Sequence, residues 1–187
     1  MKIAISGTAG IGKSSLAKAL ADKLRLPLIA ENYETLFDKP KKITDTGQLA
    51  EAILRILESK QQLEEQHGSF VTDRCPIDLF HLWMKTGLWV RQQETERLYN
   101  MAVQQVDQYD LVVFPPSGIL AADSEHETRD FRQRTPSKYV QMYNHASIIG
   151  LALLWMPAER LLFLPGASQS VDERAEAVIR TLTALKG

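Results

Sequence analysis

Residues 7–14 read Gly7-Thr8-Ala9-Gly10-Ile11-Gly12-Lys13-Ser14, and this stretch decides the fold. It is a complete G-x-x-x-x-G-K-[ST] pattern, preceded by the apolar run Ile3-Ala4-Ile5 and followed by leucines at helical spacing. Between a strand and a helix, the glycines of such a loop let successive backbone N–H groups point inward around an anion. The stretch therefore predicts a phosphate-binding loop at the N-terminus of a helix.

The defined positions of the pattern have separate chemical tasks. Lys13 is expected to reach the β- and γ-phosphates of a nucleoside triphosphate, and the Ser14 hydroxyl to ligate Mg²⁺. The predicted cofactors are thus ATP and Mg²⁺. The residues predicted to hold the nucleotide are Gly7, Thr8, Ala9, Gly10, Ile11, Gly12, Lys13, Ser14 and Ser15.

Length and composition restrict the class of protein. The chain has 187 residues, of which 44% are hydrophobic and 24% charged, which is typical of one globular domain spanning residues 1–187. The formal net charge of -1 provides no basic field for nucleic acid or an anionic membrane. The single cysteine, Cys75, excludes an internal disulfide framework, and we expect a reducing cytoplasmic location.

Short β-rich runs alternate with longer helical patterns along the whole chain. This alternation predicts an α/β fold of βαβ units, with a parallel sheet covered by helices on both faces. The expected strands are residues 2–6, 27–30, 69–72, 111–114 and 160–164. The expected helices are residues 14–24, 48–65, 77–85, 94–106 and 137–154, and a last helix that begins at the capping box Ser170-Val171-Asp172-Glu173.

Asp73 and Arg74 directly follow the third expected strand. A carboxylate at the C-terminal end of a strand beside the phosphate loop can hold Mg²⁺ or accept the proton of an attacking hydroxyl. Arg74 could pair with a phosphate or orient the acceptor. An isolated Asp-Arg pair is usually a surface ion pair, but the preceding apolar strand and the phosphate loop favour a functional role here.

These features resemble the P-loop small-molecule kinases: thymidylate and other nucleoside monophosphate kinases, deoxynucleoside kinases and, more closely, NadR-type nicotinamide riboside kinase domains. The resemblance rests on residues 7–14, on Glu31 after the second strand, on Asp73-Arg74, and on the arginines Arg129, Arg132 and Arg134. It implies a P-loop NTPase fold with a five-stranded parallel sheet, a helical region on the substrate side and a mobile helical lid.

Glu31 is a second candidate carboxylate, because the strand before it would deliver it to the same edge of the sheet as Asp73. In deoxynucleoside kinases an acidic residue at this place acts as the base on the acceptor hydroxyl. Here Glu31 is followed by Asn32-Tyr33-Glu34 in place of the proline-containing continuation common in those enzymes. The sequence therefore leaves open whether Asp73 or Glu31 receives the proton, and also leaves open a capping or solvated Glu31.

The candidate lid, about residues 119–136, is the longest polar stretch of the chain. Arg129 and Arg132 are three residues apart, so one helical turn could direct both toward a transferring phosphoryl group. The first half of the stretch is acidic, which is also typical of a solvated loop. The predicted catalytic residues are Lys13, Asp73, Glu31, Arg74, Arg129 and Arg132, and the predicted metal ligands are Ser14 and Asp73.

The interpretation that unites these features is an ATP- and Mg²⁺-dependent phosphotransferase acting on a nucleoside, a nucleotide or a nicotinamide riboside-like acceptor. A regulatory P-loop NTPase switch without a small-molecule acceptor is the alternative from a second class, and a nucleotide-binding assembly module is a third. The expected partners are a nucleotide and a small acceptor, without stable nucleic acid or membrane binding. The sequence leaves a homodimer open.

Overall fold

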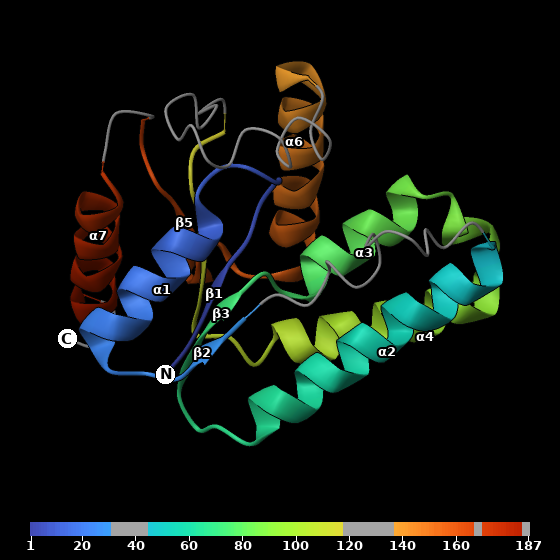
Figure 1. Cartoon of the computed structure of the whole chain (residues 1–187), viewed down its shortest axis with the longest axis horizontal. Helices are drawn as coiled ribbons and strands as arrows, with labels where there is room; N and C mark the ends of the chain where they lie inside the picture. Colours follow the sequence, from blue (N-terminus) through green and yellow to red (C-terminus); the bar gives the residue numbers. More distant parts are fainter. Residues whose placement is uncertain (31–44, 118–136, 167–169, 185–187) are drawn as a thin grey trace.

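A single parallel sheet organises the molecule (Figure 1). The computed structural model describes residues 1–30, 45–117, 137–166 and 170–184, and the following statements concern these residues. The sheet has five strands in the order β2-β3-β1-β4-β5, with every pairing parallel. The strands are β1 (Lys2–Ile5), β2 (Leu28–Ile29), β3 (Phe70–Asp73), β4 (Leu111–Phe114) and β5 (Leu161–Phe163).

Helices cover both faces of this sheet. Helices α1 (Lys13–Leu24) and α7 (Val171–Ala184) lie side by side on one face. The other face carries α3 (Pro76–Lys85) and α6 (Lys138–Trp155), with α2 (Thr46–Glu65) and α4 (Gln92–Val106) packed against α3. Two short 3₁₀ turns complete the described elements, at Leu88–Val90 and Ala158–Arg160. The predicted α/β class and the five-stranded parallel sheet are confirmed.

The central strand β1 contributes side chains to both layers of the core. Ile3 and Ile5 pack with α1 and α7, whereas Ala4 belongs to the cluster under α3 and α6. All three side chains have no exposed surface. A strand buried on both faces needs an uninterrupted apolar run, which is why Ile3-Ala4-Ile5 signals a central strand even though it is short.

The sheet register brings the phosphate loop and Asp73 to one edge. Ile5, the last residue of β1, lies opposite Asp73 of β3 and Val113 of β4. Two further backbone hydrogen bonds of 2.9 Å extend these ladders, from Ser6 N–H to the Val113 carbonyl and from Arg74 N–H to the Ile5 carbonyl. Because the strands are parallel, residues 6–14 and 73–75 follow strands that end at the same edge of the sheet.

Most predicted boundaries agree with the structure to within one or two residues. The edge strand β2, expected over residues 27–30, spans Leu28–Ile29, and within the described residues it pairs only with β3. The predicted capping box is confirmed: Glu173 N–H donates to Ser170 Oγ at 3.2 Å, and Ser170 N–H donates to the Glu173 carboxylate at 2.7 Å. Within the described ranges no helix has the length and apolar character needed to cross a bilayer.

Candidate active site around the phosphate loop

The phosphate loop has backbone angles that favour glycine. Gly7, Gly10 and Gly12 have φ angles of 125°, 78° and 81°. Space is also restricted at Gly7, where a Cβ atom would lie 2.7 Å from the Ile11 side chain and 3.0 Å from the His145 ring. Gly12 is the N-cap of α1. The loop therefore ends at a helix N-terminus, as an anion site of this kind requires.

Lys13 and Ser14 follow at the first turn of α1. The Lys13 side chain is buried, and its Nζ donates a 2.7 Å hydrogen bond to the Thr8 carbonyl across the loop. Its ammonium group is thus held within the loop that would surround a phosphate. Ser14 is exposed, so its hydroxyl is accessible to a ligand of the loop.

Asp73 is a buried carboxylate at the end of β3. Only 5% of its surface is exposed, and its Oδ1 atom is buried with no hydrogen-bond partner among the residues that the structure describes. Buried carboxylate oxygens are nearly always hydrogen-bonded or bound to a metal, so this oxygen beside the phosphate loop is a candidate metal ligand. The chemistry of Asp73 and Ser14, two oxygen donors, fits Mg²⁺.

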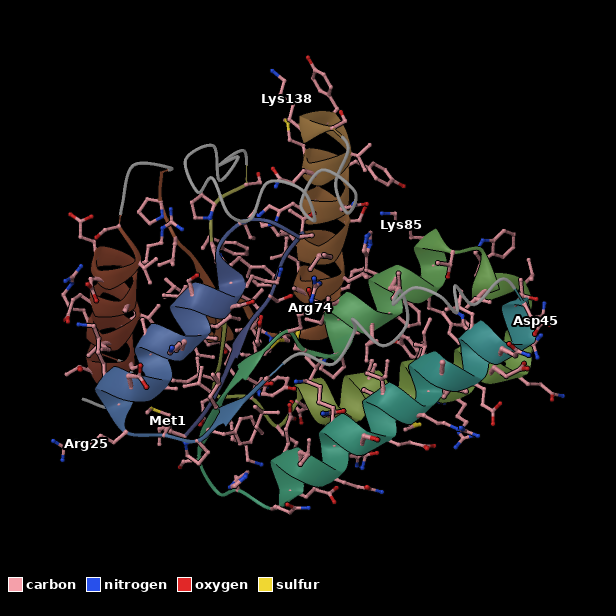
Figure 2. All side chains as sticks on the ribbon, in the orientation of Figure 1. Met1, Arg25, Asp45, Arg74, Lys85 and Lys138 are labelled. Carbon is pink, nitrogen blue, oxygen red and sulfur yellow. The ribbon has the colours of Figure 1, made fainter. Side chains whose placement is uncertain are left out.

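Arg74 connects β3 to α3 in an unusual backbone conformation (Figure 2). Its φ angle is 65°, in the left-handed region that residues other than glycine rarely adopt. Its Nη1 lies 3.4 Å from the Asp78 carboxylate. This conformation turns the chain sharply away from the sheet, so that α3 begins directly beside the phosphate loop.

Asp78 is the residue that joins the loop to α3, and sequence reasoning missed it. Its buried carboxylate accepts hydrogen bonds from Ser6 Oγ at 2.7 Å, Gly7 N–H at 3.3 Å and Cys75 N–H at 3.0 Å. A sequence signal did exist, because Pro76 at the first helical position and an acidic residue two positions later are typical of a helix N-terminus.

Cys75, the N-cap of α3, is fully buried. Burial raises the pKa of its thiol, and the neighbouring Asp78 carboxylate raises it further. A thiol of this kind stays protonated at neutral pH, so Cys75 is a structural residue and not a nucleophile.

Helix α6 turns a polar stripe toward the phosphate loop, formed by Gln141, Asn144 and His145. All three are at least nine-tenths buried, and Gln141 Nε2 donates a 3.0 Å hydrogen bond to the Ala9 carbonyl of the loop. One polar atom of each has no hydrogen-bond partner in the described part of the chain: Gln141 Oε1, Asn144 Oδ1 and His145 Nδ1. The spacing i, i+3, i+4 reflects one helix face, but nothing in the sequence shows that this face meets the loop.

The structure thus brings together part of the predicted site. Lys13, Ser14, Asp73 and Arg74 lie at one edge of the sheet, at the ends of adjacent elements. Glu31 and the candidate lid, with Arg129, Arg132 and Arg134, lie outside the described residues. The residues added by the structure are Asp78 and the stripe on α6.

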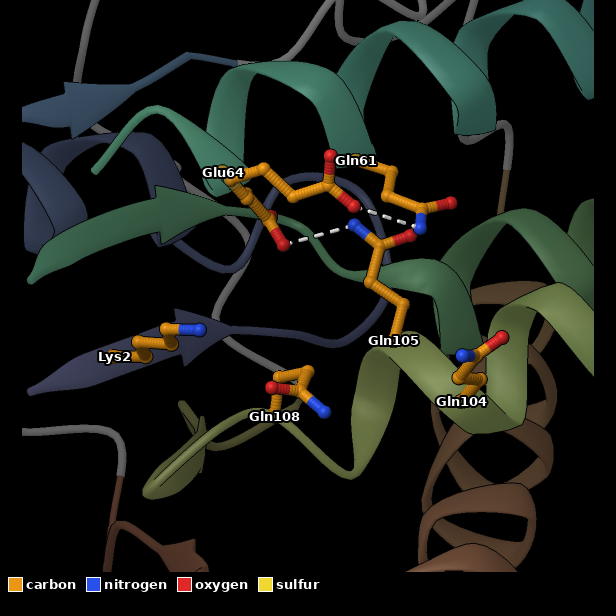
Figure 3. A pocket seen from close by; sticks show the side chains of 7 residues that line it. Lys2, Gln61, Glu64, Gln104, Gln105 and Gln108 are labelled. Carbon is orange, nitrogen blue, oxygen red and sulfur yellow. Dashed lines mark hydrogen bonds between the residues drawn. The ribbon is translucent and has the colours of Figure 1, made fainter. Parts of the chain in front are cut away.

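A small polar pocket lies at the other end of β1, away from the phosphate loop (Figure 3). It encloses about 250 Å³ and is lined by Lys2 and by residues from the last turns of α2 and α4. Its buried carboxylate, Glu64, is already satisfied by Gln105 Nε2 at 2.8 Å, Tyr109 Oη at 2.9 Å and Lys60 Nζ at 3.4 Å. This network is therefore a structural link between α2, α4 and β4.

Comparison with protein families assigns the chain to a class. Residues 2–153 match the family described as AAA domain, and the chain belongs to that family. No curated protein sequence matches it.

Solved structures agree with the fold. A deoxyadenosine kinase from M. mycoides has a TM-score of 0.69 at 17% identity, with 99% of this chain and 100% of that chain covered. A NadR protein solved with NR has a TM-score of 0.67 at 15% identity and covers 96% of this chain, which spans 51% of the NadR length. A thymidylate kinase from Ehrlichia chaffeensis has a TM-score of 0.61 at 14% identity, covering 97% and 98%. The predicted resemblance to P-loop small-molecule kinases is confirmed at the level of the fold.

Proposed function

We propose that this protein is an ATP-dependent kinase that phosphorylates a small acceptor: a nucleoside, a nucleotide or a nicotinamide riboside-like compound. The observation that carries the proposal is the open, buried carboxylate of Asp73 beside a complete phosphate loop. A carboxylate at this place can hold Mg²⁺ in a switch NTPase as well, but in a kinase it can also receive the proton of the acceptor hydroxyl. The names of the similar structures, which include deoxyadenosine and thymidylate kinases, support the same choice.

The proposed reaction is an attack of an acceptor hydroxyl oxygen on the γ-phosphorus of ATP. A new P–O bond forms to the acceptor, the bond to the β-phosphate oxygen breaks, and ADP leaves. The acceptor proton passes to a carboxylate, either Asp73 or Glu31. The Lys13 ammonium exchanges its hydrogen bond to the Thr8 carbonyl for one to the phosphates. Together with the loop N–H groups, it stabilises the charge on the transferring group.

Mg²⁺ fits the residues present and would be held by the Ser14 hydroxyl and the Asp73 carboxylate together with phosphate oxygens. When bound, it supplies charge neutralisation on the phosphates. Arginines of the segment 119–136 are proposed as a lid that adds further positive charge, with Arg129 and Arg132 as the leading candidates. The domain assignment, a single kinase-like unit over residues 1–187, belongs to the same proposal.

The decisive experiment measures ADP release from ATP with and without a panel of acceptors: nucleosides, nucleoside monophosphates and nicotinamide riboside. We expect one acceptor to stimulate ADP release strongly and to yield a phosphorylated product by mass spectrometry. Lys13→Ala should lower turnover by orders of magnitude, because it removes a charge-assisted contact to the phosphates. Lys18→Ala, an exposed lysine on the same helix, is the matched control.

Other results of the ADP-release and ATP-binding experiments would argue against the kinase proposal. ADP release at one rate, with or without any acceptor of the panel, would contradict the kinase and favour the NTPase switch. Binding of ATP without any turnover would favour an assembly module. Unchanged ATP affinity in Lys13→Ala, measured by calorimetry, would show that the loop does not hold the nucleotide as proposed.

A further inference from the structure

Arg174 is a buried cation beside the phosphate loop. It lies in the first turn of α7, the helix that runs beside α1 (Figure 1), and only 6% of its surface is exposed. Its Nη1 lies 3.6 Å from the position of a Cβ atom built on Gly12. The guanidinium is therefore in contact distance of the loop residue that precedes Lys13.

Within the described residues, no carboxylate forms an ion pair with this guanidinium, and its Nε has no hydrogen-bond partner. The acidic residues of the same helix have other partners. Asp172 and Glu176 pair with Lys23 at 3.5 and 3.0 Å, and Glu173 is used in the capping box with Ser170. The local sequence thus provides no compensation for the charge of Arg174.

A buried charge without a counter-ion is strongly unfavourable, and the surroundings of Arg174 make it more so. The N-termini of α1 and α7 both carry the positive end of a helix dipole, and Lys13 adds a cation next to Gly12. An anion bound in the loop would compensate all of these groups at once.

We propose that Arg174 is a nucleotide-binding residue that contacts the phosphate chain at Gly12, from the α7 side of the loop. The inference rests on the proposed function only in requiring a nucleotide in the loop, and it does not depend on which acceptor is used. Because loop amides near Gly12 hold the α- and β-phosphates, Arg174 recognises this part of the chain. Bound nucleotide then links α7 to α1 and β1.

The test is calorimetric titration of the full chain with ATP and, separately, with inorganic tripolyphosphate. Arg174→Met keeps most of the apolar stem and removes the charge, whereas Arg174→Lys keeps the charge. Arg180→Met, at an exposed position of the same helix, is the matched control. We expect Arg174→Met to weaken both ligands by about tenfold or more, Arg174→Lys to recover part of the loss, and Arg180→Met to match the wild type.

Affinities equal to wild type in Arg174→Met would overturn the proposal, and a lower melting temperature alone would assign Arg174 to packing. Weaker ATP binding with undiminished tripolyphosphate binding would place the contact on the ribose or base and overturn the phosphate assignment. Absence of ATP binding by the wild type would overturn it together with the nucleotide site. If the wild type binds ATP but phosphorylates no acceptor, the kinase proposal fails while the result for Arg174 stands.

Discussion

Asp73 and Asp78 are both buried carboxylates, five residues apart, yet their hydrogen-bonding surroundings differ. Asp78 accepts hydrogen bonds from Ser6, Gly7 and Cys75, so its oxygens are fully occupied by the protein. The Oδ1 of Asp73, buried at the edge of the sheet, has no hydrogen-bond partner within the described ranges. A satisfied carboxylate holds structure, whereas an open one is available to a metal or a proton.

At Asp73, replacement by Asn keeps the shape and removes the negative charge. We expect Asp73→Asn to reduce acceptor phosphorylation at saturating Mg²⁺ by about a hundredfold or more, with little change in the melting temperature. Steady-state rates and melting curves, with Asp22→Asn at an exposed position of α1 as control, provide the comparison. Near wild-type phosphotransfer would leave Glu31 as the leading candidate for the base.

At Gly7, a side chain is disfavoured for two reasons. The φ angle of 125° is one that residues with a Cβ atom rarely adopt, and a Cβ atom would lie too close to Ile11. Gly7→Ala should destabilise the fold by about 1–3 kcal/mol and abolish tight ATP binding, because the loop must shift away from Ile11 and His145. Gly68→Ala is the control, since a Cβ atom there would have no neighbour within 4 Å. Chemical denaturation and ATP titration of both variants test this, and a Gly7→Ala protein with wild-type ATP affinity would contradict it.

At the scale of elements, the start of α3 is fixed by the same carboxylate that fixes the start of the loop. Asp78→Asn should lower the free energy of unfolding by about 1.5–3 kcal/mol, because charge-assisted hydrogen bonds are lost in a buried site. A double-mutant cycle with Ser6→Ala should show coupling between the two positions. Asp107→Asn, whose carboxylate is largely exposed, should change stability little. Additive effects of Asp78→Asn and Ser6→Ala would refute the link.

Helix α6 shows the limit of prediction from sequence. Its range was predicted well, since Ser137 caps it and Tyr139 N–H donates to the Ser137 hydroxyl. The face that meets the phosphate loop was not predicted, because Gln141 and His145 contact a loop more than a hundred residues earlier in the chain. Arg174 was missed for the same reason. Local signals locate elements, whereas contacts between distant segments decide which of their faces meet.

At the scale of the whole molecule, the fold was predictable because its signals are local and repeated. Each strand is a short apolar run, and the central position of β1 follows from its loop and its full burial. The phosphate loop and Asp73-Arg74 were found because they follow strands directly. The structure gives the positions of Lys13, Ser14, Asp73 and Arg74, but the roles of all predicted site residues stay predictions, and Glu31 and the arginines of 119–136 also lie outside the described residues.

Two histidines near the site make stability depend on pH. Burial lowers the pKa of His145, with Lys13 nearby lowering it further, and burial also lowers the pKa of His81, both from 6.5. Below pH 6.5 the unfolded chain therefore binds more protons than the native one, so the free energy of unfolding falls as the pH decreases. Well above that pH the two histidine rings are neutral in both the native and the unfolded chain, so they no longer lower the free energy of unfolding.

We expect His145→Gln to reduce this pH dependence. Urea denaturation at about pH 7.5 and about pH 5.5 gives the difference in unfolding free energy for each variant. The wild type should lose more stability on acidification than His145→Gln, and the double variant with His81→Gln should lose least. An equal loss in all three proteins would show that other groups govern the acid sensitivity.

The central position of β1 also has a consequence for protein synthesis. The loop at residues 7–14 leaves the ribosome before the residues that support it, which are Val113 in β4, Gln141 in α6 and Arg174 in α7. A nascent chain therefore carries the phosphate-binding sequence long before it has a working pocket. Ribosome-arrested chains of increasing length should be retained by an immobilised ATP analogue only after α7 has emerged, and retention of chains that end before β4 would contradict this order.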